Sequence, residues 1–257
     1  MSQAAATRDP ARTVLTALAA FGTLWLGVAG GGPSARAAEP AAEATAAAEA
    51  TPVAEATSAT EAAPVAEPAT PMAARLAAWI TSSGDNESLP FVIVDKPGAK
   101  VLVYNARGRL VGKAPALLGL AVGDDSAPGI GKRALSAIRP EERTTPAGRF
   151  IGRLGPAKGE EGQVLWVDYG DAISLHPVVT TNRKERRLQR LKSSSTTDRR
   201  ISFGCINVPA RFFTNVVRKT FKGTRGVIYV LPDTRPVEEV FPIFALQARV
   251  STASAQN

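Results

Sequence analysis

Between residues 89 and 232 the sequence alternates short apolar runs with turns rich in glycine and proline, a pattern typical of short β-strands. Val101-Leu102-Val103-Tyr104, followed directly by Asn105-Ala106-Arg107-Gly108, adds the signal of a hairpin. About 145 residues of this kind can enclose one hydrophobic core, which predicts an all-β sandwich or barrel. The predicted strands are 91–95, 100–105, 109–118, 148–151, 164–168, 172–175 and 227–231.

Two segments have the periodicity of short amphipathic helices instead. In residues 72–81, Met72, Leu76 and Ile80 recur at helical spacing, and Ser82-Ser83-Gly84 follows as a stop signal. Residues 72–88 are therefore expected to be a helix and lead-in that pack on the domain. Residues 209–219 begin with a proline suited to a first helical turn and predict a second helix. The tail, residues 233–257, has no clear pattern.

The first 71 residues differ in pattern from the rest. Residues 1–37 combine a basic start, an apolar run and a small-x-small cleavage site, which predicts an export signal peptide. The apolar run is at the short limit for a membrane span, so an uncleaved anchor is the alternative. No cysteine follows directly, which excludes a lipid anchor. Residues 38–71 hold Ala, Glu, Thr and Pro without an aromatic residue, and predict a disordered linker.

Charge separates these two parts of the chain further. The whole sequence has a net charge of +8, but residues 72–257 alone hold 28 Lys and Arg against 16 Asp and Glu. A basic domain suits an anionic surface such as a wall polymer. Nucleic acid is not expected, because no basic segment interleaved with aromatic residues is present. Residues 182–200 carry eight basic and two acidic residues, and predict a mobile, solvated loop.

The candidate chemistry centres on the only cysteine, Cys205, and the only histidine, His176. A thiol is nucleophilic as its thiolate, and a neighbouring imidazole can accept the proton and later protonate a leaving amine. If the protein is exported, the single thiol stays unpaired in an oxidising compartment, which favours a function for it. The alternative is that a lone cysteine serves as a small core residue.

The residues around Cys205 suit a nucleophile turn. Gly204 allows unusual backbone angles, and its amide or that of Cys205 could bind an oxyanion. Ser202 could hydrogen-bond the turn or the substrate, and Asn207 could fix the loop.

With these residues in place, the chain resembles the L,D-transpeptidase catalytic domain of the YkuD type. Ser202-Phe203-Gly204-Cys205-Ile206-Asn207 matches the Ser-x-Gly-Cys signature that follows a histidine in that family. Thr145-Pro146-Ala147-Gly148-Arg149-Phe150 is similar to its Thr-Pro-x-Gly-x-Phe segment, and residues 91–104 resemble its opening strand pair. The resemblance covers residues 89–232.

The resemblance implies a YkuD-type β-sandwich and an enzyme exported to the periplasm or cell envelope. Its substrates would be peptidoglycan stem peptides, which Cys205 would attack to form an acyl-enzyme thioester, with His176 as base. Gly204 and Cys205 would form the oxyanion hole, supported by Ser202 and Asn207. An acceptor amine would then complete a crosslink or attach a wall protein. No metal or organic cofactor is implied.

Two departures from the family pattern affect the details. Pro177 follows His176 where Gly, Ser or Thr is usual, so a backbone carbonyl or another hydroxyl must orient the imidazole. The interval of 29 residues between His176 and Cys205 is long because it contains residues 182–200. This segment would form a lid or basic rim, with Arg199 and Arg200 binding substrate carboxylates beside Phe203. A solvated loop without substrate contact is the alternative.

Two other functions fit the same residues. Water could resolve the acyl-enzyme, giving a hydrolytic amidase or carboxypeptidase. The domain could also be a non-catalytic wall-binding module that binds through its basic charge.

Overall fold

The computed structural model describes residues 69–157 and 162–244. The predicted signal peptide and nearly all of the predicted linker lie outside these ranges, as does the end of the tail. Within the described residues, no helix has the length and apolar character needed to cross a membrane.

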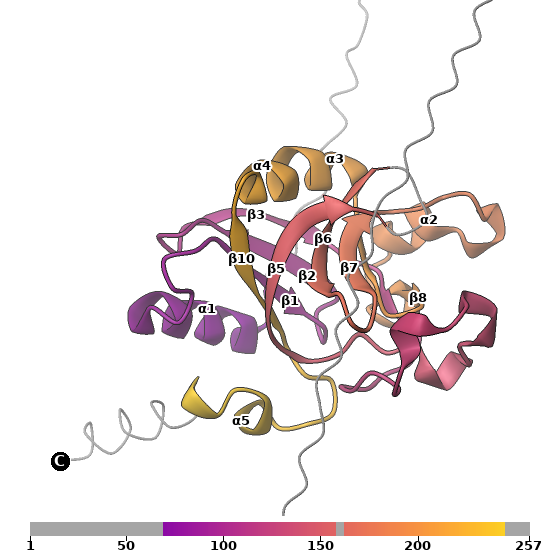
Figure 1. Cartoon of the computed structure of the whole chain (residues 1–257), viewed down its shortest axis with the longest axis horizontal. Helices are drawn as coiled ribbons and strands as arrows, with labels where there is room; N and C mark the ends of the chain where they lie inside the picture. The colour runs from indigo at the N-terminus through magenta and orange to yellow at the C-terminus, as the bar shows by residue number, and fades with distance from the viewer. Residues whose placement is uncertain (1–68, 158–161, 245–257) are drawn as a thin grey trace, which may run out of the picture. The chain divides into compact units, whose positions relative to one another are not determined.

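The protein is mainly β, as the sequence predicts, and its strands form one eight-stranded and one two-stranded sheet (Figure 1). The large sheet has the order β3-β2-β1-β10-β5-β6-β7-β9. Its neighbours are antiparallel except for the parallel pairs β1–β10 and β7–β9. The strands are β1 (Phe91–Asp95), β2 (Lys100–Tyr104), β3 (Leu110–Pro115), β4 (Leu118–Gly119), β5 (Gly148–Pro156), β6 (Gln163–Asp168), β7 (Ile173–Pro177), β8 (Arg200–Ser202), β9 (Ile206–Val208) and β10 (Arg225–Val230).

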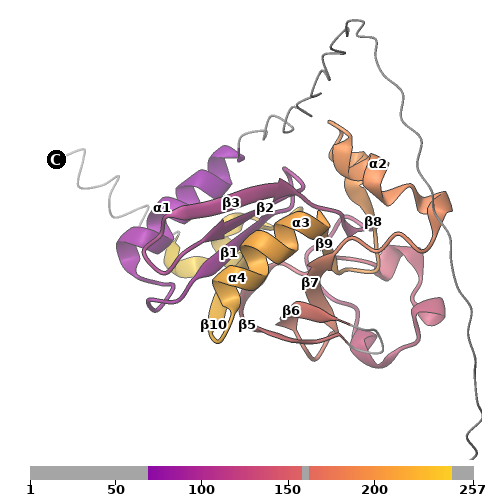
Figure 2. The ribbon, with the colours of Figure 1, turned by 90° about the horizontal axis from the view of Figure 1, so that it is seen from above.

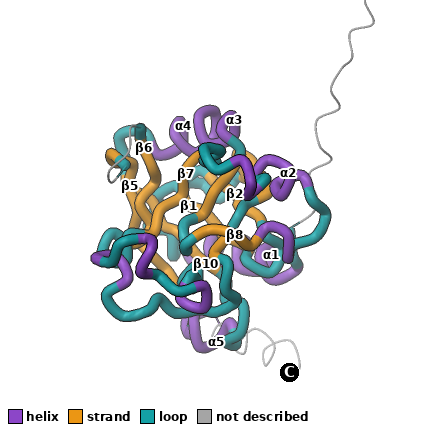
Figure 3. Tube along the Cα trace, turned by 90° about the vertical axis from the view of Figure 1, so that its right-hand side faces the viewer, coloured by secondary structure: helices purple, strands orange, loops and turns teal. Residues whose placement is uncertain are grey.

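The large sheet folds around a shared core. Buried residues of β1 and β2 belong to the same hydrophobic cluster as buried residues of β6, β7 and β9, although these strands lie toward opposite ends of the sheet. The strands gather in the middle of the molecule, with helices and loops around them (Figure 3). This arrangement fits the predicted β-sandwich or barrel. Strands β4, β8 and β9, each of two or three residues, are too short to give a periodic signal in the sequence.

Both faces of the central strands are covered, which explains their continuous apolar sequence. In β1, Val92 and Val94 face the main core, whereas Phe91 and Ile93 face a second cluster beneath α1 (Pro71–Ser83). Helix α1 and the short α5 (Val237–Val240) lie on one side of the sheet, and α3 and α4 on the other (Figure 1).

Helix α1 confirms the first predicted helix and extends it at both ends. The Thr70 side chain caps the helix by accepting a hydrogen bond from the Ala73 amide, and Gly84 ends it in the left-handed conformation at φ 72°. The predicted linker therefore reaches one residue into the helix, because Pro71 is its first residue. The buried face includes Leu76 and Ile80, both fully inaccessible to solvent.

The second predicted helix follows Cys205 and contains an unpredicted change of geometry. It consists of α3 (Ala210–Phe212), a π-helical turn η6 (Phe213–Val217) and α4 (Arg218–Phe221), which together lie across the sheet (Figure 2). Phe213, Val217 and Phe221 are buried in the main core. Their spacing of four residues keeps one apolar face through the wider turn.

Residues 182–200 are mostly exposed, as expected of a solvated segment, but they are more ordered than a loop. They fold into a 3₁₀ turn η4 (Arg183–Glu185), helix α2 (Arg187–Lys192) and a second turn η5 (Thr197–Arg199). Leu191 and Arg199 are buried, and Arg190 bonds the carbonyl oxygens of Glu185 and Asp198. Side-chain hydrogen bonds to the backbone thus provide order that the poor apolar content does not predict.

Three further 3₁₀ turns precede β5: η1 (Ile130–Lys132), η2 (Leu135–Ala137) and η3 (Pro140–Glu142). The described part of the tail, for which the sequence has no clear pattern, returns to the core. Phe241 and Phe244 are buried in the cluster beneath α1, and the Phe244 ring lies 5.5 Å from that of Trp79.

Candidate active site

The parallel pairing of β7 and β9 brings Cys205 and His176 together. His176 lies opposite Asn207 in the register, and Cys205 directly precedes β9. The thiol and the imidazole share a hydrogen bond. The Cys205 Sγ also lies 3.7 Å from the Ser174 Oγ and 3.5 Å from the Ala172 carbonyl oxygen. The two residues singled out from the sequence are therefore neighbours at the end of adjacent strands.

The surroundings of the thiol favour its ionised form. Partial burial of Cys205 raises its pKa, but the hydrogen bond and the positive charge of His176 lower it, as do hydrogen bonds from Ser174. The net effect places the pKa of Cys205 below its ordinary value. A larger fraction of thiolate at neutral pH is what a nucleophilic cysteine needs.

A backbone carbonyl orients the imidazole. The His176 Nδ1 lies 2.8 Å from the Pro177 carbonyl oxygen, and because a carbonyl only accepts, Nδ1 carries the proton. Nε2 is then the ring nitrogen that can accept a proton. Proline at position 177 is compatible with this role, because it keeps its carbonyl. The Ser174 hydroxyl lies beside the sulfur instead.

The turn before Cys205 requires glycine. Gly204 has φ +122°, and a Cβ at this position would lie 2.6 Å from the Thr144 carbonyl oxygen and 2.9 Å from Ile173 Cδ1. The Ser202 hydroxyl braces the turn, because it accepts from the Gly204 amide at 3.1 Å and donates to the Cys205 carbonyl at 2.6 Å. The Gly204 amide is thus engaged within the turn, which leaves an oxyanion role for the Cys205 amide as the remaining prediction.

Thr145 supports this turn through its side-chain hydroxyl. In the sequence, Thr145 was singled out only as part of a motif, and this structural role was not predicted. Its hydroxyl donates to the Gly204 carbonyl at 2.8 Å and accepts from the Gly119 amide at 2.9 Å. Gly119 allows this approach, since a Cβ there would lie 2.3 Å from the Arg143 carbonyl oxygen. The fully buried Thr145 therefore ties the nucleophile turn to β4.

Asn207 connects the two central residues. Its Nδ2 lies 3.4 Å from His176 Nε2 and 3.3 Å from the Cys205 carbonyl oxygen, and the side chain is completely buried. Arg187 donates from Nη1 to the Asn207 Oδ1 at 2.7 Å. Sequence reasoning missed Arg187, because nothing in the basic run of residues 182–200 distinguishes it from the other seven cations.

The three residues expected to bind substrate have partners within the protein. The buried Arg199 donates to the carbonyl oxygens of Ser193 at 2.5 Å and Ala99 at 3.4 Å. Arg200 pairs with Asp233 at 2.6 Å. The Phe203 ring is half-buried, and the Arg143 guanidinium lies 4.0 Å from its centroid. A substrate-binding role for these residues stays a prediction, and both predicted arginines have structural roles here.

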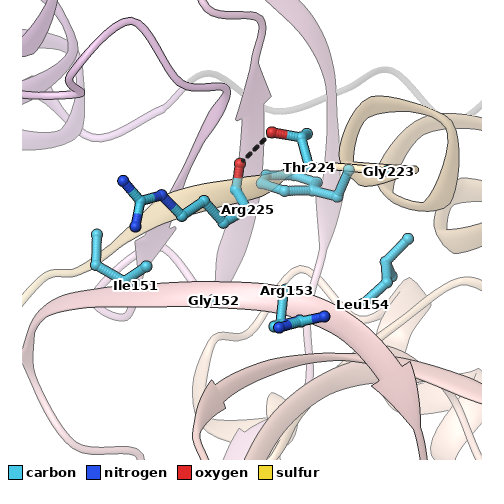
Figure 4. A pocket seen from close by; sticks show the side chains of 8 residues that line it. Ile151, Gly152, Arg153, Leu154, Gly223, Thr224 and Arg225 are labelled. Atoms are coloured by element: carbon cyan, nitrogen blue, oxygen red, sulfur yellow. Dashed lines mark hydrogen bonds between the residues drawn. The ribbon is translucent and has the colours of Figure 1, made fainter.

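A surface pocket lies elsewhere on the sheet, between β5 and β10 (Figure 4). Arg153 and Arg225, which are opposite each other in the register, contribute to its wall. Neither Cys205 nor His176 lines it. Among the described residues, no group of three or more His, Cys, Asp or Glu side chains could hold a metal ion.

Comparison with protein-family models found no family that matches this chain. A search of curated proteins found no significant match.

Proposed function

We propose that this protein is a cysteine-dependent L,D-transpeptidase that acts on peptidoglycan stem peptides through an acyl-enzyme thioester. The observation that carries the proposal is the hydrogen-bonded pair of Cys205 and His176, with the imidazole held by the Pro177 carbonyl. A nucleophile, a base and a group that orients the base are the parts that acyl transfer requires. The Ser-x-Gly-Cys-x-Asn motif supports the choice of substrate.

The first half of the reaction uses the geometry around the sulfur. His176 Nε2 accepts the thiol proton, and the thiolate attacks the carbonyl carbon of the peptide bond between an L-centre and a D-residue. The Cys205 amide is the proposed donor that stabilises the oxyanion as it forms. When the tetrahedral intermediate collapses, the carbon–nitrogen bond breaks and the imidazolium donates its proton to the leaving amine. The products are a thioester on Cys205 and a released D-residue.

The second half returns the enzyme to its starting state. An acceptor amine from another stem peptide, or from a wall-attached protein, attacks the thioester. His176 accepts a proton from the attacking amine and gives it to the departing sulfur, so that an amide bond replaces the thioester. Water in place of the amine would give hydrolysis instead.

Incubation of the purified protein with muropeptides tests the proposal. We expect crosslinked dimers and released D-residues, and we expect both to vanish in Cys205→Ala. Hydrolysed monomers without dimers would show the amidase or carboxypeptidase activity instead. Wall binding that persists in Cys205→Ala, with no product from either protein, would identify a binding module and refute the enzyme.

A second test uses acylation alone. Family members of this type are acylated by carbapenems, so we expect a covalent adduct of one carbapenem by mass spectrometry in the wild type and none in Cys205→Ala. Absence of the adduct from a folded wild-type protein would contradict a reactive thiol.

A further inference from the structure

The Arg187 side chain connects helix α2 to the interior of the site. Its Nη1 donates to the Asn207 Oδ1 at 2.7 Å, and its Nε lies 2.5 Å from the Glu185 Oε2. Only 12% of the Arg187 side chain is exposed, and Asn207 is completely buried. Arg187 is thus the point where the segment 182–200 contacts the Asn207 side chain.

This contact determines which way the Asn207 amide faces. A guanidinium is a donor only, so the atom that faces Arg187 must be the amide oxygen. The amide nitrogen then faces the Cys205 carbonyl oxygen and His176 Nε2, both of which can accept. If the amide rotated by half a turn, its oxygen would face these two acceptors and its nitrogen would face the guanidinium.

We propose that Arg187 is a positioning residue that fixes the Asn207 amide and thereby keeps Nε2 of His176 as the acceptor for the Cys205 proton. The inference rests on the proposed function of the Cys205 and His176 pair, and it gives residues 182–200 a role at that site. The segment then acts through the hydrogen bond of one arginine, whereas its other cations are not needed for this effect.

The charges near the imidazole determine the sign of the expected effect. The positive charge of the Arg187 guanidinium disfavours a positive charge on the nearby His176 imidazole. The amide N–H group of Asn207 faces Nε2 and disfavours a proton on that nitrogen. The Glu185 carboxylate offsets part of the guanidinium charge. The Cys205 thiolate favours the imidazolium. Removal of Arg187 should therefore stabilise the protonated imidazole, and removal of Glu185 should destabilise it.

His176 is the only histidine in the chain, so one imidazole signal in NMR reports its titration in a protein without added histidines. We expect Arg187→Leu to raise the midpoint of this titration by about one pH unit. Glu185→Gln should keep the contact with Asn207 and lower the midpoint. If Arg187→Leu fails to fold, Glu185→Gln still tests the inference, because a midpoint that rises or stays unchanged in that variant would contradict it.

Two further variants separate the contact from the stability of the loop. Arg190→Leu is the matched control, because Arg190 lies on the same helix and bonds the carbonyl oxygens of Glu185 and Asp198. It should loosen the loop and leave the midpoint unchanged. Arg187→Lys retains a charged donor and should restore the wild-type midpoint. An unchanged midpoint in folded Arg187→Leu, or an equal shift in Arg190→Leu, would overturn the inference.

The titration needs no peptidoglycan, so its result is independent of the muropeptide assay. If the wild type forms no crosslinks but the midpoints shift as described, the positioning role stands and the proposed function fails. If crosslinks form and the midpoints stay fixed, the function stands and the role of Arg187 fails.

Discussion

At the scale of single residues, the reactivity of Cys205 depends on a balance of opposing effects. Burial disfavours the thiolate, whereas His176 and Ser174 favour it, and the second group of effects is larger. The same partial burial removes water that would compete for the sulfur and the imidazole. A small change in either neighbour should therefore change the thiolate fraction measurably.

Replacement of His176 by glutamine should raise the pKa of Cys205. The hydrogen bond and positive charge of the imidazole that lower this pKa are lost, and burial of the sulfur, which raises it, remains. In the folded wild type, the pKa of Cys205 lies below the ordinary value for a thiol. The thiolate therefore persists at a pH below that ordinary value, and it is lost as the pH falls through the pKa of the folded protein. We expect alkylation by iodoacetamide at pH 7 to slow by about tenfold or more.

The pH profile of alkylation is the measurement that checks this prediction. Ser174→Ala is the control and should raise the pKa of Cys205 less, because it removes only a side-chain hydrogen bond that contributes less than the imidazole. Equal profiles for the wild type and His176→Gln would contradict the assigned contact.

Gly204→Ala should destabilise the fold, because the new Cβ meets the Thr144 carbonyl oxygen in a turn with φ +122°. We expect a loss of about 1–3 kcal/mol from backbone strain alone, with an added cost from the contact. Gly223→Ala is the matched control, since Gly223 has φ +75° and no atom within 4 Å of the added Cβ. Urea unfolding should show a clearly larger loss for Gly204→Ala, and equal losses would argue against the contact.

At the scale of elements, helix α1 is held on the sheet by its apolar face. Ala73, Leu76 and Ile80 are completely buried against β1, β2 and the tail. The Thr70 side chain also donates to Asp95 at the end of β1 at 3.0 Å, so the start of the helix is attached to the strand it covers. The helix thus belongs to the domain and covers the second face of the central strands.

Leu76→Ala should lower the free energy of unfolding by about 2–5 kcal/mol, because it leaves a cavity between α1 and the sheet. Ala78→Ser lies on the exposed face of the same helix and should cost about 0.5 kcal/mol or less. Thermal unfolding of both variants measures the difference. Similar stability of the two would mean that α1 contributes little to the fold.

At the scale of the whole molecule, a buried charge network joins segments that are distant in sequence. The completely buried Lys96 donates to Asp124 at 2.7 Å and to the Thr145 carbonyl at 2.8 Å, and lies 3.4 Å from Asp233. Asp124 in turn accepts from the amides of residues 233–235. The network thereby fastens the tail to the loops that support the Cys205 turn.

Asp124→Asn should remove part of the acid sensitivity of the fold. Burial raises the pKa of Asp124, but the hydrogen bond from Lys96 and those from residues 233–235 lower it well below its ordinary value. A carboxylate with a lowered folded pKa stabilises the protein above its unfolded pKa, and this stabilisation is lost as the pH falls from about 5 through the folded value. At pH 7 the variant should lose about 3–5 kcal/mol, because Lys96 loses a buried partner.

Urea unfolding measured from about pH 2 to about pH 7 covers the range in which this stabilisation is lost, and it checks the prediction. Asp125→Asn is the control, since that carboxylate is 78% exposed and pairs with Arg235 at the surface. We expect a change of about 1 kcal/mol or less in the control. An unchanged acid slope in Asp124→Asn would show that other groups cause the acid sensitivity.

Local sequence patterns located the long elements but not all of their bounds, since β5 extends five residues beyond the strand predicted at 148–151. The strand at 91–95 has the predicted bounds, and α1 exceeds the predicted helix by only one or two residues at each end. Apolar periodicity and turn residues act within a few neighbours along the chain, so they can be read without the fold. Strand β9 was not predicted, because its three residues are too few for a periodic pattern and its parallel pairing with β7 joins residues that are distant in sequence.

The identity of the central pair could also be found from the sequence, because the chain offers one thiol and one imidazole. Their contact could not, since it depends on the parallel register of β7 and β9 across an interval of 29 residues. The contacts of Arg187 and Thr145 could not be predicted from the sequence either. Nor could the bonds of Arg199 and Arg200 to partners within the protein. Composition determined which chemical groups exist, and tertiary structure alone decided which of them meet, because hydrogen bonds and ion pairs depend on positions in space.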